Sequence, residues 1–107
     1  MSVNYVRAIP ITYINSADLA GDFAVVNAGL PEACFLLRII NDSNIDVDVS
    51  YDGAVMHDYV TAGSHLDINA QANATPDGYV ALFRKGLPVY VRAQGGAGYI
   101  YVVGYYA

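Results

Sequence analysis

Residues 45–53 read I-D-V-D-V-S-Y-D-G, and this strict alternation of apolar and polar residues is the feature that most limits how the chain can fold. A period of two residues is typical of a β-strand with one buried and one solvated face. Turn formers then interrupt the chain at short intervals, because it contains ten glycines, four prolines and many Asn and Asp residues. The pattern predicts short strands joined by turns.

The composition supports the same fold class. Glu and Lys, both good helix formers, occur once each, at Glu32 and Lys85, whereas Ile, Val, Tyr and Thr recur throughout. A length of 107 residues suits one domain with one core. We expect an all-β chain, folded over 1–107 as a single antiparallel β-sandwich or jelly-roll-like barrel of about seven to nine short strands.

Turn signals divide the chain into segments. Pro10 cannot donate to a strand ladder and predicts an edge strand or a bulge, while residues 34–41 are apolar on both faces and predict a central strand. Asp52-Gly53 predicts a short hairpin turn, and the glycine-rich 95–98 predicts a hairpin between the last two strands. The expected strands are 3–14, 23–27, 34–41, 45–51, 55–60, 64–69, 79–83, 87–93 and 99–106, with loops at 15–22 and 70–78.

The aspartates of the opening stretch partly imitate a calcium loop. From Asp48 the spacing matches through Asp52 and Gly53, but the bidentate Glu of position twelve is replaced by Tyr59. Oxygens on one strand face lie about 7 Å apart, too far to close around one ion. We therefore expect a solvated strand face and no cofactor. A metal site at Asp46, Asp48 and Asp52, completed by another segment or subunit, is the minor alternative.

No catalytic motif stands out. His57 and His65 lack the spacing of a zinc site, and the chain has no nucleophile elbow and no phosphate-binding glycine loop. Cys34, the single cysteine, lies in an apolar run and is expected to be a buried core thiol. We expect a protein that is not an enzyme.

Charge and hydropathy limit the partners. A net charge of -5 argues against nucleic acid, because binding to phosphates depends on Lys and Arg. No apolar run approaches the roughly 20 residues of a spanning helix, and the first residues lack a signal-peptide pattern. We expect neither nucleic acid nor membrane as a partner.

Tyrosine is abundant, with ten copies in a chain that is 55% hydrophobic and only 14% charged. In the last strand Tyr99 and Tyr101 share one face, and Ile100 and Val102 share the other, so both faces require cover. Tyrosine suits protein contacts and sugar binding alike. We expect either an interface or a tyrosine-rich core whose hydroxyls reach the rim. The candidate interface tyrosines are Tyr99, Tyr101, Tyr105 and Tyr106.

Charged residues are unevenly placed along the chain. Residues 41–77 contain seven Asp and no Lys or Arg, whereas residues 78–107 contain Arg84, Lys85 and Arg92 and no acid. If the fold separates these regions, copies could meet head to tail through an acidic and a basic flank, with the three cations as interface residues. Alternatively, the strands interleave and the charges average out.

A set of short motifs spans the last two thirds of the chain. They are Y-D-G at 51–53, H-D-Y-V at 57–60, A-G-S at 62–64, A-L-F at 81–83, K-G at 85–86, V-Y-V at 89–91 and G-Y-Y at 104–106. Together they resemble small virion proteins of tailed bacteriophages. The resemblance implies a β-sandwich or jelly-roll module present in many copies as a head decoration, neck or tail component.

These observations lead to one expected function and one alternative. We expect a non-enzymatic structural protein that binds its own copies and other virion proteins through edge strands and a tyrosine-rich C-terminal hairpin. The resemblance implies a location in the virion, after assembly in the host cytoplasm. The alternative is a carbohydrate-binding β-sandwich, in which exposed tyrosines form a platform for a glycan.

Overall fold

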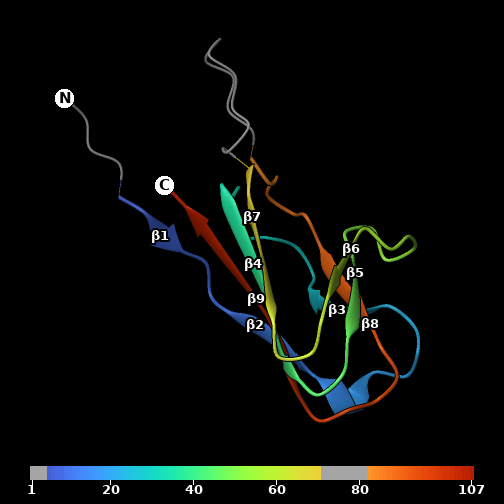
Figure 1. Ribbon diagram of the computed structural model, residues 1–107. Coiled ribbons are helices and arrows are strands. Elements are labelled where there is room, and N and C mark those ends of the chain that lie inside the picture. Colours follow the sequence, from blue (N-terminus) through green and yellow to red (C-terminus); the bar gives the residue numbers. More distant parts are fainter. Residues whose placement is uncertain (1–4, 71–81) are drawn as a thin grey trace, which may run out of the picture.

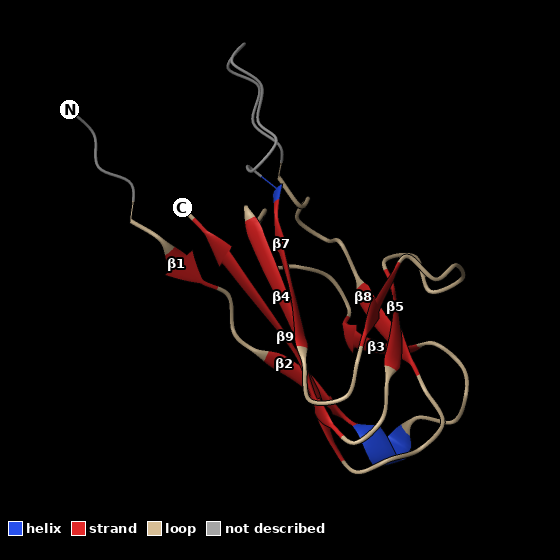
Figure 2. Ribbon diagram, viewed as in Figure 1, coloured by secondary structure: helices blue, strands red, loops and turns tan. Residues whose placement is uncertain are grey.

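In the computed structural model, which describes residues 5–70 and 82–107, two antiparallel β-sheets pack face to face (Figures 1 and 2). The prediction of an all-β sandwich is therefore confirmed. The elements in chain order are β1 (Arg7–Ala8), β2 (Thr12–Asn15), the 3-10 helix η1 (Ser16–Asp18), β3 (Ala24–Asn27), β4 (Leu36–Ser43), β5 (Val47–Ser50), β6 (Asp58–Val60), β7 (His65–Asn69), β8 (Val89–Arg92) and β9 (Gly98–Tyr106).

The larger sheet has the strand order β1-β9-β4-β7, and β2 also pairs with β9. The long strand β9 carries both N-terminal strands along one edge and β4 along the other. Pro10 lies in the gap between β1 and β2, which confirms the edge predicted there. Strand β4 lies between β9 and β7, as the apolar run 34–41 predicted.

The smaller sheet has the strand order β3-β8-β5-β6. In β5 the alternation predicted from the sequence is confirmed on one face, because Val47 and Val49 are fully buried. These valines pack with Val91, Ile39 and Val102, which come from both sheets. The main core thus lies between the two inner faces.

A second cluster lies against the inner face of the larger sheet. It contains Ile9, Leu30, Cys34 and Leu37, with Tyr106 packed against it. Cys34 is fully buried, as predicted, and its burial raises the pKa of the thiol. The Cys34 Sγ atom donates to the backbone oxygen of Glu32 at 3.4 Å, so this thiol belongs to the core.

The predicted C-terminal hairpin is wrong. β8 belongs to the smaller sheet and β9 to the larger one, so residues 93–97 cross between the sheets (Figure 1). Glycine lets the backbone of this crossing pass close to neighbouring side chains. Gly96 has φ +116°, and a Cβ atom there would lie 2.5 Å from Ser16 Oγ and 2.8 Å from Ile45 Cδ1.

The hairpin predicted around Asp52-Gly53 is confirmed, because β5 pairs with β6, but its short turn is wrong, since β5 ends at Ser50 and β6 begins at Asp58. The connection 51–57 is longer because side chains organise it locally. Ser50 Oγ accepts a hydrogen bond from Gly53 N at 2.9 Å, and Asp52 Oδ1 accepts from Ala54 N at 2.8 Å. The loop is a folded cap on the end of the strand pair.

Other predicted segments differ in detail from the structure or extend beyond the described residues. Residues 15–22 were predicted as a loop but include η1, whose N-cap is Asn15. Residues 71–78 of the predicted loop and residues 79–81 of the predicted strand 79–83 lie outside the described residues, as do residues 3 and 4 of the first predicted strand. Phe83 is described and forms an isolated bridge with Cys34.

Candidate functional site

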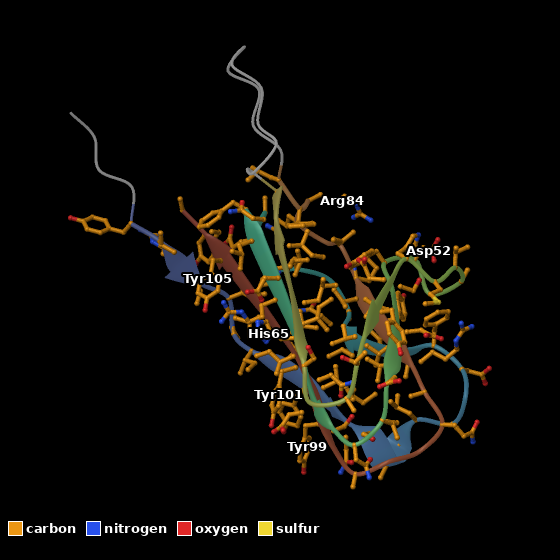
Figure 3. The ribbon with its side chains drawn as sticks, in the orientation of Figure 1. Asp52, His65, Arg84, Tyr99, Tyr101 and Tyr105 are labelled. Atoms are coloured by element: carbon orange, nitrogen blue, oxygen red, sulfur yellow. The ribbon has the colours of Figure 1, made fainter. Side chains whose placement is uncertain are left out.

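The outer face of the larger sheet gathers aromatic and aliphatic side chains. Along β9 the even residues 100, 102 and 104 are buried, so the odd residues point away from the core (Figure 3). Strand register adds outward residues from β2, β4 and β7. We call this surface the tyrosine face and define it by Ile11, Tyr13, Asn15, Leu36, Arg38, Ile40, Asp42, His65, Asp67, Asn69, Tyr99, Tyr101, Val103 and Tyr105.

Three rings form the centre of its aromatic part. Tyr13 and Tyr99 meet edge to face with ring centroids 5.8 Å apart, and Tyr101 lies 6.2 Å from Tyr13 and 6.1 Å from Tyr99. These separations are typical of favourable aromatic pairs. Tyr13 nevertheless remains 63% exposed and Tyr99 40% exposed. The cluster is held in place within the subunit and still presents large apolar area.

The predicted interface tyrosines divide between the two sides of the sheet. Tyr99, Tyr101 and Tyr105 lie on the tyrosine face (Figure 3). Tyr106 packs against the second core cluster, because it follows Tyr105 in an extended strand. The sequence interpretation missed Tyr13, whose position beside Tyr101 depends on the pairing of β2 with β9.

The predicted basic residues do not form one patch with these tyrosines. Arg92 lies on the smaller sheet, with Nη2 3.0 Å from Asp48 Oδ2 and its guanidinium 4.3 Å from the centre of the Phe23 ring. Arg84 and Lys85 are exposed in the turn before β8. Since β5 and β8 are neighbours, the acidic and basic regions interleave at this pair, and a separate basic flank that includes Arg92 is contradicted.

Each aspartate of the metal alternative has its own partner. Asp46 accepts from Ala62 N and from the Tyr59 hydroxyl, both at 2.8 Å, and these hydrogen bonds lower its pKa. Asp48 binds Arg92. Hydrogen bonds from backbone amides lower the pKa of Asp52 to about 2. Within residues 5–70 and 82–107, no group of three or more His, Cys, Asp or Glu side chains could hold a metal ion.

The outer face of the smaller sheet differs because the chain covers part of it. Ser50 points to this side and is still fully buried, since the loop 51–57 folds over it. A Cβ atom at Gly53 would lie 3.1 Å from the Tyr90 ring, which shows how closely the loop packs on β8. This side is covered only in part, because Val25 and Tyr59 stay 47% and 49% exposed, whereas the tyrosine face exposes a cluster of rings in mutual contact.

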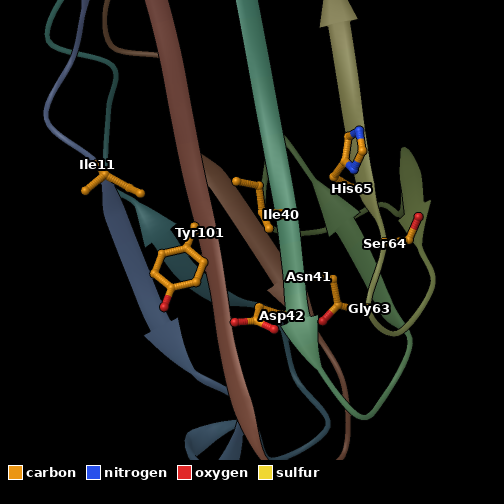
Figure 4. Close-up of a pocket in the computed structure, with 8 residues that line it drawn as sticks. All are labelled: Ile11, Ile40, Asn41, Asp42, Gly63, Ser64, His65 and Tyr101. Atoms are coloured by element: carbon orange, nitrogen blue, oxygen red, sulfur yellow. The ribbon is translucent and has the colours of Figure 1, made fainter.

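A shallow groove crosses the tyrosine face (Figure 4). Its volume is about 320 Å³. Tyr101 and Ile40 supply aromatic and aliphatic walls, and Asp42, Ser64 and His65 supply polar groups. Sequence interpretation did not find this groove, because its residues come from four separate segments. The complete lining is Ile11, Ile40, Asn41, Asp42, Gly63, Ser64, His65 and Tyr101.

Comparison with known proteins adds no relative. No protein-family model, curated protein or solved structure matches this chain. Among the described residues, no helix has the length and apolar character required to cross a membrane.

Proposed function

We propose that this chain is a non-enzymatic structural protein that assembles in multiple copies by burying its tyrosine face against neighbouring proteins. The observation that carries this proposal is the cluster of Tyr13, Tyr99 and Tyr101, whose rings contact one another while Tyr13 and Tyr99 stay exposed. A contiguous apolar patch of this kind marks an interaction site in many proteins. Tyrosine is also among the residues enriched at the centres of interfaces.

Burial of this face supplies a driving force for assembly. Burying apolar surface is worth about 25 cal/mol per Å², and a tyrosine ring adds a large rigid area with few side-chain torsions to fix. Ile11, at 54% exposure, extends the patch beyond the rings. Its neighbour Ile40 is half-buried beside Tyr101. Contact with another protein would remove all of these side chains from water.

The proposed setting is the virion of a tailed bacteriophage, where the chain would be a head decoration, neck or tail component. This part of the proposal is supported by the resemblance of residues 51–106 to small virion proteins. A sandwich with an exposed aromatic cluster on one sheet suits a repeated structural part, because each copy can bury that cluster against a neighbour.

Mass spectrometry of purified virus particles tests this function. Particles isolated from the source of the chain, washed in high salt and digested, are expected to contain its peptides in many copies per particle. A matched fraction without particles should lack them. Absence of the chain from clean particles, with its presence in the unassembled fraction, would overturn the structural role.

The groove supports carbohydrate binding as a second candidate function. Its aromatic and aliphatic walls suit the apolar face of a sugar ring, and the carboxylate of Asp42 and the hydroxyl of Ser64 can bond sugar hydroxyls. Its volume is near the lower limit of small-ligand pockets, which begin at about 300 Å³. One sugar unit is therefore the expected occupant.

A glycan array tests this second candidate. Binding that is lost in Tyr101→Ala and Asp42→Asn, and kept in Tyr105→Ala, would support a saccharide in the groove. Tyr105 is a matched control, because it lies on the same strand and face but does not line the groove. Binding that is equal in all three variants would exclude the groove as the sugar site.

A further inference from the structure

We propose that the partner covering the tyrosine face is the tyrosine face of a second copy of this chain, so that two larger sheets pack face to face around a two-fold axis. This inference depends on the proposed role of that face in assembly and adds the identity and geometry of the partner. Three properties of the face support it: the order of its rows, the positions of its charges and its size.

The outward residues form three rows across the sheet. In the central row Tyr13 lies opposite Tyr101, Tyr101 opposite Ile40, and Ile40 opposite His65. In the row on one side, Asp42 lies opposite Tyr99, which pairs in turn with Asn15. In the row on the other side, Arg38 lies between Val103 and Asp67.

The charges of the outer rows are complementary under one symmetry operation. The two-fold axis lies in the interface and runs across the strands, along the central row. Rotation about this axis places each outer row of one copy opposite the other outer row of the second copy. Because Ile40 is midway between Arg38 and Asp42 on β4, this axis places Arg38 of each copy opposite Asp42 of the other. The contact then contains two interchain ion pairs on either side of an aromatic and aliphatic centre.

The net charge of the face also permits self-association. The face carries one cation, Arg38, and two carboxylates, Asp42 and Asp67, so it contributes little to the overall charge of -5. Arg38 already binds Asp67 within the subunit, with Nε 2.8 Å from Oδ1. Asp42 is the other carboxylate of the face. In the proposed dimer its cation is Arg38 of the second copy.

The size of the face fits a reversible dimer. The residues of β2, β4, β7 and β9, each covering about 3.4 Å along the strand and 4.8 Å across it, project a flat area of roughly 450 Å². The protruding tyrosines raise the accessible area above this projection. Specific interfaces begin at about 600 Å² per partner, and small interfaces are usually the weaker ones. A face near this lower limit suits a weak dimer, whose population rises with protein concentration.

The test measures the mass of the purified full chain by light scattering over a concentration series. Wild type is expected to approach twice the monomer mass and to stop there, because an isologous contact closes at two copies. Arg38→Glu and Asp42→Lys each place like charges together twice, and each is expected to weaken dimerisation at least tenfold. The matched control Asp22→Lys, at an exposed aspartate outside the face, is expected to remain dimeric.

Mixing the two variants tests whether the two-fold axis runs along the central row. In a heterodimer, the Glu introduced at position 38 of one chain faces the Lys introduced at position 42 of the other. The unchanged Asp42 of the first chain faces the unchanged Arg38 of the second. The equimolar mixture of Arg38→Glu and Asp42→Lys is therefore expected to dimerise again. Melting temperatures of the separate variants show that each is folded.

Three results would overturn the inference. A wild-type chain that stays monomeric throughout would remove the second copy as the partner, while the chain could still be found in purified particles. Folded variants that both stay monomeric when mixed would refute the proposed axis. Variants that dimerise like wild type would place the interface elsewhere.

Discussion

Arg92 and Asp48 join the smaller sheet across neighbouring strands, with Arg92 Nε and Nη2 at 3.1 and 3.0 Å from the same carboxylate oxygen. The guanidinium also lies 4.3 Å from the centre of the Phe23 ring. One side chain thus connects β5, β8 and the segment before β3. This contact joins the acidic middle of the chain to its basic C-terminal third.

Replacing Arg92 with Met is expected to lower the free energy of unfolding by about 1 kcal/mol, because both the half-exposed ion pair and the ring contact are lost. For a domain of this size the melting temperature should fall by about 5 °C. Calorimetry measures the change. Arg84→Met is the matched control, and an equal decrease in both variants would show that the Arg92 contacts contribute nothing.

The loop 51–57 is expected to weaken in acid. In the folded state the pKa of Asp52 is about 2, below its ordinary value of 3.8, because Val55 N, Ala54 N and Ser50 Oγ donate to the carboxylate. The folded state therefore favours the ionised form. The stabilisation that the ionised Asp52 carboxylate gives to the folded state is complete above about pH 4 and is lost as the pH falls from about 4 to 2.

Urea unfolding at pH 7 and pH 3 measures this effect. Asp52→Asn is expected to lower the free energy of unfolding at pH 7. Between pH 7 and pH 3 the free energy of unfolding should then decrease less than it does in wild type. Asp22→Asn, at an exposed site outside the loop, serves as the control. If Asp52→Asn keeps the whole pH dependence of wild type, the loop carboxylate does not stabilise the fold.

The crossing between the sheets is expected to tolerate no side chain at position 96. Gly96→Ala should cost about 1–3 kcal/mol, because the added Cβ would meet Ser16 and Ile45 and because φ is positive. Gly95→Ala is the neighbouring control, since it also has positive φ but has nothing within 4 Å of the added atom. Equal losses of stability in both variants would attribute the cost to backbone strain alone.

Local patterns predicted the parts of the fold that depend on one strand at a time. The alternation in β5 matches the burial of Val47 and Val49, and Pro10 marks an edge. The apolar run 34–41 matches the central position of β4. Each of these features is visible within a few residues of sequence.

Features that depend on distant segments were missed. The glycine run before β9 has the composition of a hairpin turn, but its glycines permit close packing against Ser16 and Ile45. Likewise, Tyr13 joins Tyr99 only through the pairing of the N-terminal strand with the last one. Sequence alone places neither contact, because register between distant strands is set by the packed sandwich.

The most direct test of the central claim is the solvent accessibility of individual tyrosines in the assembled state. Hydroxyl-radical footprinting compares the isolated chain, diluted until light scattering gives the monomer mass, with assembled particles that contain it. Tyr13 and Tyr99 are expected to become strongly protected on assembly, whereas Tyr59, 49% exposed on the smaller sheet, should react as before. Protection of Tyr59 with unchanged reactivity of Tyr13 and Tyr99 would contradict assembly through the tyrosine face.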